Sequence, residues 1–329
     1  MRFGAFVPQG WRMELARIDQ ADHWSTMLGV AQALEDSGFE SGWVFDHFHT
    51  IPIPSQEVTY EAWTLMSALA ASTDSLRLGQ MCTCNGYRAP SYLAKVAASI
   101  DVISDGRLEM GIGGGWYEEE FLGYGYKFPK PAVRLGELDE AVQIMQRMWT
   151  EDEVFFEGRY YQLQGAICQP KPVQVPHVPI WVAGGGEQLT LRTAARYASH
   201  TNFGLDLESF IHKSEVLAKH CAEQGTDVDE IVRSSNFTIA IGETTDAAED
   251  KMAWLEDYYT QLEVPEENTK RQVGFIKEAG LWGSPDRIIS DLKDWEAAGL
   301  TYAILFFPEA PYDRRGIELF AKEIIPAFR

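Results

Sequence analysis

A carboxylate and two imidazoles follow a short apolar run in this chain. Residues 43–45 (Trp-Val-Phe) have the composition of a strand buried on both faces, and Asp46, His47 and His49 come just after it. Catalytic groups of parallel α/β proteins lie at the carboxyl ends of strands. An imidazole transfers protons near neutral pH, and a nearby carboxylate tunes it. The pattern predicts an enzyme in which His47 is the acid–base group.

The same residues allow two other interpretations. Adjacent strand residues point to opposite faces, so Asp46 and His47 are not expected to touch, and His47 could be a buried structural histidine. His47 and His49 could also form the H-x-H pair of a zinc site. Such a site needs further ligands from later strands, but His177 precedes a predicted strand and His200 comes early in the next one. We therefore expect no metal.

Strand-like and helical patterns alternate along the whole chain. Eight such units predict an α/β fold, a (β/α)8 TIM barrel formed by residues 1–329 as a single domain. One predicted helix begins with Ser284 as N-cap and Pro285 in its first position. The predicted strands are residues 3–7, 42–45, 76–82, 107–112, 178–183, 199–203, 233–242 and 301–307. The predicted helices are residues 23–37, 61–71, 90–103, 116–123, 132–149, 187–197, 207–223, 247–262, 284–298 and 315–328.

Two glycine clusters follow predicted strands. Gly113 and Gly114 come after the fourth strand, and Gly184, Gly185 and Gly186 after the fifth. A doubly wound sheet, the main alternative fold, would concentrate its glycines after the first strand. The later cluster precedes a predicted helix, so its backbone N–H groups are able to hold a phosphate. The earlier cluster lets a flat group approach the backbone. Each cluster alone is also typical of ordinary turns, but together they predict a phosphorylated, planar cofactor.

Aromatic side chains crowd the same predicted loops. Trp11 lies after the first strand and Trp116 after the fourth, although any one such residue could instead belong to the core. Residues 153–176 interrupt the alternation with a hairpin pattern around Glu157-Gly158, followed by three prolines. Long insertions between barrel units are usually lids or contact surfaces, and the alternative is a spacer without a role.

The 329 residues include 28 Lys and Arg against 49 Asp and Glu, a net charge of −21. This charge repels nucleic acids and anionic membranes, so we expect neither as a partner. The N-terminal residues lack the pattern of a signal peptide, and no apolar stretch reaches the length of a membrane span. Four scattered cysteines fit a reducing compartment, so we expect the protein to be cytoplasmic.

Four stretches resemble the bacterial luciferase-like family of flavin and deazaflavin oxidoreductases, and the resemblance covers nearly the whole chain. The Asp-His-Phe-His sequence that begins at Asp46 is most similar to the branch that uses coenzyme F420, a 5-deazaflavin. The four stretches are residues 43–48 (WVFDHF), 78–90, 104–116 (SDGRLEMGIGGGW) and 283–300.

The resemblance implies a barrel with the deazaflavin lying across the carboxyl ends of the strands. His47 corresponds to the active-site histidine beside the ring, and Asp46 to its cofactor-contacting neighbour. A cis non-proline peptide bond is implied between Met81 and Cys82, behind the central ring. The remaining cofactor contacts that we expect are Thr83, Gly113, Gly114, Gly184 and the phosphate-binding Gly185 and Gly186.

One loop departs from the family pattern. Some dehydrogenases of this branch carry a glutamate that acts as an acid after the fourth strand. Here Trp116 occupies that place, and Glu118 is the first of three glutamates just beyond it. No basic cluster is evident near the mouth of the predicted barrel, so we do not expect a sugar phosphate as substrate. The residues expected around the substrate are Trp11, His49, Trp116 and Glu118.

We therefore expect an F420-dependent oxidoreductase that moves a hydride between the deazaflavin and a small organic substrate, with His47 handling the accompanying proton. An FMN-dependent luciferase-like monooxygenase is the first alternative, because it would use the same strand-end glycines. A flavin-binding carrier or sensor without catalysis is the second. Family members commonly dimerise through helices after the early strands, so the resemblance also implies a homodimer.

Overall fold

The computed structural model describes residues 1–329, which group into two compact units. The first unit comprises residues 1–61, 204–211 and 234–329, and the second comprises residues 62–203 and 212–233. The chain therefore leaves the first unit twice and returns to it twice.

Parallel strands form the centre of the first unit. β10 (Val232–Ile241) pairs with β12 (Tyr302–Phe306), β12 pairs with β1 (Arg2–Phe6), and β1 pairs with β2 (Ser41–Val44). The three-residue strand β11 (Leu281–Gly283) pairs with the end of β10. Every residue of β2 and β12 is buried, as expected for parallel strands that are covered on both faces.

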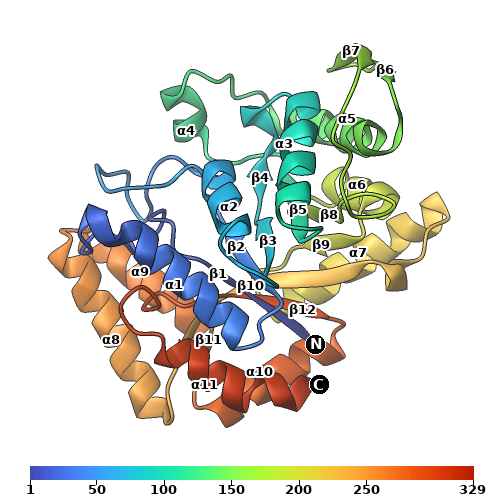
Figure 1. Cartoon of the computed structure of the whole chain (residues 1–329). Coiled ribbons are helices and arrows are strands. Elements are labelled where there is room, and N and C mark those ends of the chain that lie inside the picture. The colour runs from blue at the N-terminus through green and yellow to red at the C-terminus, as the bar shows by residue number, and fades with distance from the viewer. The chain divides into compact units, whose positions relative to one another are not determined.

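Five helices belong to the first unit, and they bury apolar stripes against its strands. Phe320 of the last helix meets Phe3 of β1 edge-on, with ring centroids 5.2 Å apart. Figure 1 shows α8 and α9 running beside each other along one edge of this unit. The helices are α1 (His23–Asp36), α8 (Thr245–Gln261), α9 (Glu266–Ala279), α10 (Pro285–Ala297) and α11 (Arg315–Glu323).

The second unit has its own set of parallel strands. β3 (Arg77–Gln80) pairs with β5 (Leu108–Gly113), β5 with β8 (Ile180–Ala183), and β8 with β9 (His200–Asn202). The two-residue strand β4 (Thr83–Cys84) pairs with the carboxyl end of β5. Four main parallel strands therefore lie in each unit.

Helices also follow the strands of the second unit. α3 and α5 lie together, and the indole N–H of Trp149 on α5 donates a 2.9 Å hydrogen bond to the carbonyl of Ala94 on α3. The first residues of α7 belong to the first unit. The helices are α2 (Ala62–Ala70), α3 (Pro90–Ile103), α4 (Glu118–Gly123), α5 (Pro131–Thr150), α6 (Thr190–Tyr197) and α7 (Leu207–Gln224).

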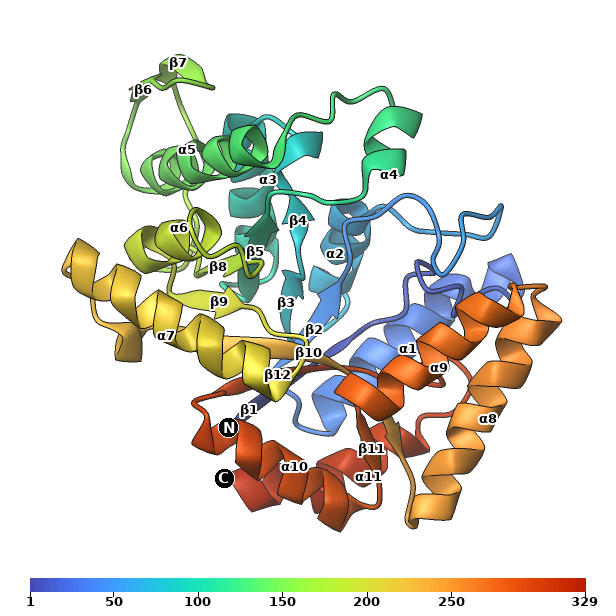
Figure 2. The same ribbon diagram turned by 180° about the vertical axis from the view of Figure 1, so that it is seen from behind.

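The insertion at residues 153–176 contains the predicted hairpin. β6 (Val154–Glu157) pairs antiparallel with β7 (Gln162–Ala166), and both views of the chain show this hairpin projecting beyond the end of α5 (Figure 1, Figure 2). The carboxylate of Glu140 on α5 accepts hydrogen bonds of 2.7–3.0 Å from the N–H groups of Arg159, Tyr160 and Tyr161 in the hairpin turn. One side chain thus holds the turn against α5.

The predicted alternation of strands and helices is confirmed, since all eight predicted strands are present. The predicted helix over residues 315–328 is interrupted, because Pro326 leaves only a 3₁₀ turn (Ile325–Phe328) after α11. Ser284 is the N-cap of α10, but its hydroxyl makes no capping hydrogen bond. No helix is long and apolar enough to cross a membrane.

The sequence prediction missed α9 and β11. Only Thr269, Val273 and Ile276 of α9 are buried, so its apolar stripe is too narrow to stand out against the charged residues around it. β11 has three residues, which is too short to show an alternation.

Asp101 on α3 offers a test of how the insertion is held. Its buried carboxylate accepts hydrogen bonds from the N–H groups of Val173 (2.7 Å) and Gln174 (3.1 Å), and from the Gln174 side chain (2.7 Å). Asp101→Asn replaces one acceptor oxygen by a donor, so the free energy of unfolding in urea should fall by about 1–3 kcal/mol. Asp152→Asn, at an exposed position that makes no such contact, should leave it unchanged. Equal unfolding midpoints for the two variants would contradict this role of Asp101.

Candidate functional site

His47 lies at the carboxyl end of β2 and is stacked on Trp11. The two ring centroids are 4.1 Å apart and the planes differ by 5°. Trp11 is 6% exposed and also leans against Phe45, at a centroid distance of 4.3 Å. Asp46 is buried, whereas His47 and His49 are half-buried. The structure therefore brings Trp11 and His47, two of the predicted site residues, into direct contact.

A buried polar network shapes the loop that carries Trp11. The carboxylate of Glu14 accepts hydrogen bonds from the N–H groups of Gln9 (2.8 Å), Gly10 (3.0 Å) and Arg12 (2.7 Å). The side chain of Gln9 in turn donates to the carbonyl of Phe45 (2.8 Å) and accepts from the N–H of the same residue (2.9 Å). These bonds connect the loop after β1 to the end of β2, where His47 begins.

Gly10 is required at the tightest point of this loop. Its φ is +98°, and a Cβ atom there would lie 2.0 Å from the carbonyl oxygen of Val58. The next residue, Trp11, accepts a 2.8 Å hydrogen bond at its carbonyl from the N–H of Ile51. The position of Trp11 is thus set by backbone contacts on both sides.

Arg12 follows Trp11, and its guanidinium lies among aromatic rings. Its Cζ is 4.7 Å from the centroid of Phe306, 5.4 Å from that of Trp11 and 5.6 Å from that of Phe45. Burial lowers the pKa of Arg12, and the neighbouring Tyr259 and Glu14 oppose this shift. Burial also raises the pKa of Tyr259 to about 12. Sequence reasoning did not select Arg12, because a single arginine in a loop has no distinctive pattern.

In the second unit, the peptide bond between Met81 and Cys82 is cis, as predicted. Glycines on β5 allow the chain to pass close to it. A Cβ atom on Gly111 would lie 1.9 Å from the carbonyl oxygen of Gln80, and one on Gly113 would lie 2.7 Å from the sulfur of Cys82. Thr83 is fully buried and donates a 2.7 Å hydrogen bond to the side chain of Gln80. The predicted residues 81–83 and Gly113 therefore form one tightly packed cluster.

The second glycine cluster follows β8. Gly184 has a φ of +116°, and the backbone N–H groups of Gly185 and Gly186 donate no hydrogen bond within the protein. The side chain of Lys213 on α7 lies against Gly185, where a Cβ atom would be 2.9 Å from its Cε. Its ammonium donates a 2.8 Å hydrogen bond to Glu187. Two free N–H groups beside a lysine are suited to bind an anion.

Trp116 and Glu118 lie in the loop after β5 and at the start of α4. Trp116 is 62% exposed and stacks on Tyr117, with centroids 5.0 Å apart, and Glu118 is exposed. The glutamate that is buried in this segment is Glu120, which accepts a 2.9 Å hydrogen bond from the hydroxyl of Tyr87. Gly114 lies against Leu135 of α5.

The hairpin contacts the segment that follows β4 in the second unit. The side-chain N–H of Asn85, which directly follows β4, donates a 3.2 Å hydrogen bond to the hydroxyl of Tyr161. Burial raises the pKa of Tyr161 to about 12. Phe155, on β6 of the hairpin, is 60% exposed.

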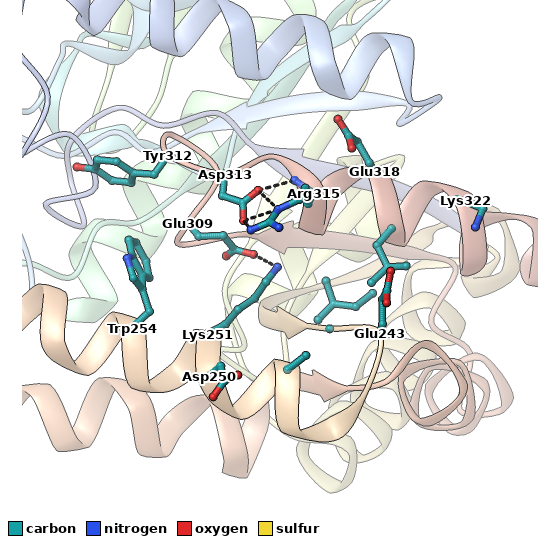
Figure 3. Close-up of a pocket in the computed structure, with 14 residues that line it drawn as sticks. Glu243, Asp250, Lys251, Trp254, Glu309, Tyr312, Asp313, Arg315, Glu318 and Lys322 are labelled. Carbon is teal, nitrogen blue, oxygen red and sulfur yellow. Dashed lines mark hydrogen bonds and ion pairs between the residues drawn. The ribbon is translucent and has the colours of Figure 1, made fainter.

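A cavity of about 720 Å³ lies within the first unit, between α8 and α11. Figure 3 shows Lys251 and Glu309 joined across it, with Nζ and Oε1 2.5 Å apart. Burial raises the pKa of Glu309, and Lys251 opposes that shift. Arg315 is paired with Asp313 at 2.7 Å in the same view. The cavity contains none of the predicted site residues, and its buried charge already has a counter-ion.

Comparison with known proteins agrees with the geometry. A model of the luciferase-like monooxygenase family matches residues 1–302. An F420-dependent glucose-6-phosphate dehydrogenase from Nocardia farcinica (strain IFM 10152) is 27% identical over 324 residues, which cover 92% of this chain and 94% of that protein.

Two solved structures superimpose on the whole chain. An F420-dependent secondary alcohol dehydrogenase in complex with an F420-acetone adduct has a TM-score of 0.80 at 21% identity, covering 100% of this chain and 99% of that one. A monooxygenase from Streptomyces bottropensis has a TM-score of 0.82 at 22% identity, covering 100% of both chains. These likenesses confirm the predicted fold class, the (β/α)8 barrel.

Gly111 tests the close packing around Met81 and Cys82. Gly111→Ala places a Cβ atom against the carbonyl of Gln80, so the end of β3 must shift, and we expect the free energy of unfolding to fall by at least about 1–3 kcal/mol. The matched control is Gly274→Ala within α9, where no atom lies within 4 Å of the added Cβ. Since alanine favours helix, the control should gain about 0.5–1 kcal/mol. Urea denaturation measures both, and an unchanged Gly111→Ala protein would refute the clash.

Proposed function

Because the chain belongs to the luciferase-like monooxygenase family, we propose that it is an F420-dependent oxidoreductase that transfers a hydride between the deazaflavin and a small organic substrate. The observation that carries the proposal is the half-buried imidazole of His47, held flat on Trp11 at the end of a barrel strand. The F420-dependent relative, which matches over 92% of this chain, supports the choice of cofactor.

His47 is the proposed acid–base group. When bound, F420 supplies a ring carbon that accepts or releases a hydride. Oxidation of an alcohol breaks its C–H bond, whose electron pair leaves with the hydride, and its O–H bond, whose proton passes to an imidazole nitrogen of His47. Stacking on Trp11 restricts rotation of the imidazole and so keeps that nitrogen in one direction.

The residues of the glycine loop fit the phosphate of this cofactor. The unpartnered N–H groups of Gly185 and Gly186, together with Lys213, offer donors and positive charge to an anion. Lys213 would have to exchange Glu187 for the phosphate. The other proposed cofactor contacts are Asp46, Met81, Cys82, Thr83, Gly113, Gly114 and Gly184.

Around the substrate we propose Trp11, His49, Trp116 and Glu118. The exposed Trp116 and Glu118 are available to a ligand, whereas Glu120 is buried and bonded to Tyr87. Trp116 stands where related dehydrogenases carry an acidic residue, so the proposed substrate is not a sugar phosphate, although the relative is named for one.

We propose that the chain acts as a homodimer in the cytoplasm and folds as one luciferase-like domain. The family model extends through both units, which supports the single domain. Tyr92 and Ile103 of α3 are 63% and 52% exposed, and Val175 of the insertion is 91% exposed, so apolar area is available in the second unit for a second copy. All four cysteines are free thiols, which suits a reducing compartment.

The first test is a fluorescence titration of the purified protein with F420 and, separately, with FMN. We expect tight binding of F420 and at least tenfold weaker binding of FMN. An anaerobic screen of alcohols and aldehydes would then search for the substrate by the change in F420 absorbance. Preferential binding of FMN would instead favour an oxygen-using monooxygenase. Binding of F420 without turnover of any compound would favour a carrier or sensor.

His47→Ala should separate catalysis from binding. We expect turnover of the first substrate found in the screen to fall by about 10²–10⁴-fold, as for loss of a general acid–base group, while the Kd for F420 changes less than tenfold. His177→Ala is the matched control, because this half-buried histidine contacts the carbonyl of Val178 and the ring of Trp149 and none of the proposed site residues. Equal losses of turnover and F420 affinity in His47→Ala would make His47 a binding residue.

A further inference from the structure

The guanidinium of Arg12, in the loop after β1, makes no hydrogen bond within the protein. Its Nε is buried without a partner, and neither Nη atom donates to a protein acceptor. Glu14 is close enough to affect it, but its carboxylate oxygens are occupied by three backbone N–H groups. Arg12 therefore has a nearby counter-charge and no direct ion pair.

Aromatic contacts alone do not explain this arrangement. A guanidinium carries five N–H donors, and cation–π contact of the kind seen with Phe306 satisfies none of them. Burying a polar group without a hydrogen bond is unfavourable, and for a charged group the cost is larger. Arg12 Nε is buried, but the two Nη atoms are not among the buried unpartnered atoms, so they stay available to a planar acceptor.

Arg12 is also close to the proposed acid–base group. Its guanidinium contacts the ring of Trp11, and the same ring carries the imidazole of His47. Phe45 and Phe306, which complete the surroundings, lie at or just beyond the carboxyl ends of β2 and β12. An anion bound to Arg12 would thus lie on the side of the strands where chemistry occurs in this fold.

We propose that Arg12 binds a carboxylate of the substrate, so that the enzyme acts on small carboxylate-bearing alcohols or carbonyl compounds with an apolar or aromatic body. The carboxylate matches the planar fork of the guanidinium, and the apolar surroundings of that fork, with Trp11, Phe45 and Phe306 buried beside it, favour a ligand with an apolar body. A phosphate ester is less well matched, because Arg17, the next arginine along the chain, is exposed and engaged by Gln261. This inference rests on the proposed oxidoreductase function.

The test uses benzoate as probe and benzamide as its neutral isostere. Binding of each to the full-length protein is measured by isothermal titration calorimetry, with and without saturating F420. Wild-type protein should bind benzoate at least tenfold more tightly than benzamide. Arg12→Gln should weaken benzoate binding at least tenfold and leave benzamide binding unchanged. Arg17→Gln, which removes an exposed arginine outside the aromatic cluster, is the matched control and should bind benzoate as wild type does.

Three further measurements guard the test against a folding defect and against the other anion class. Arg12→Lys keeps the charge and the aromatic contact but loses the fork, so its affinity for benzoate should fall between those of wild type and Arg12→Gln. Far-UV circular dichroism checks that each variant is folded. Glucose 6-phosphate is titrated in parallel and should bind more weakly than benzoate.

The outcomes separate this inference from the proposed function. Benzoate binding that is unchanged in a folded Arg12→Gln protein, or equal to benzamide binding, would overturn the role of Arg12 even if F420 binds tightly. Tighter binding of glucose 6-phosphate would overturn the carboxylate class. Benzoate binding that depends on Arg12 in a protein that does not bind F420 would keep the anion site and remove the proposed redox role.

Discussion

The carboxylate of Glu14 is the constraint on which the candidate site residues of the first unit depend. It accepts hydrogen bonds from three backbone N–H groups of the loop after β1 and so gives these donors a partner away from water. The loop carries two neighbouring side chains with different proposed roles. Trp11 holds the imidazole of His47 by stacking, and Arg12 keeps its guanidinium among aromatic rings. One buried acid thus organises a proposed proton-transfer group and a proposed substrate anchor.

The candidate cofactor residues of the second unit depend on missing side chains. Gly111 and Gly113 let β5 pass against Gln80 and Cys82, at distances that any Cβ atom would block. Gly185 leaves space for the alkyl chain of Lys213 and exposes its own N–H group. The β5 glycines therefore serve close packing within the unit, whereas the free N–H groups after β8 are suited to the phosphate of the proposed cofactor. In each unit, therefore, a few residues held by the strands carry the proposed chemistry.

The acidity of the chain gives the few basic groups a particular weight. A net charge of −21 disfavours anions in general, so an anionic ligand needs a local cation to bind. Lys251 is paired with the buried Glu309, whereas Arg12 has aromatic neighbours and no ion pair. The contrast between these cations distinguishes a group that stabilises the fold from one that is available to a ligand. A single guanidinium without an ion pair also suits a substrate with one negative charge better than a substrate with several.

The order of strands and helices, the strand-end position of His47 and the glycine loops could all be predicted from the sequence, because hydrophobic period and glycine are local signals. The cis bond at Met81–Cys82 came from family resemblance, and the structure confirms it. The sequence could not predict α9, since three buried residues make too weak a stripe. Nor could it select Arg12, Glu14 or Lys213. In a sequence, a single charged residue is most typical of the solvated surface. Only the tertiary structure decides whether its partner is a carboxylate, a backbone donor, an aromatic ring or nothing.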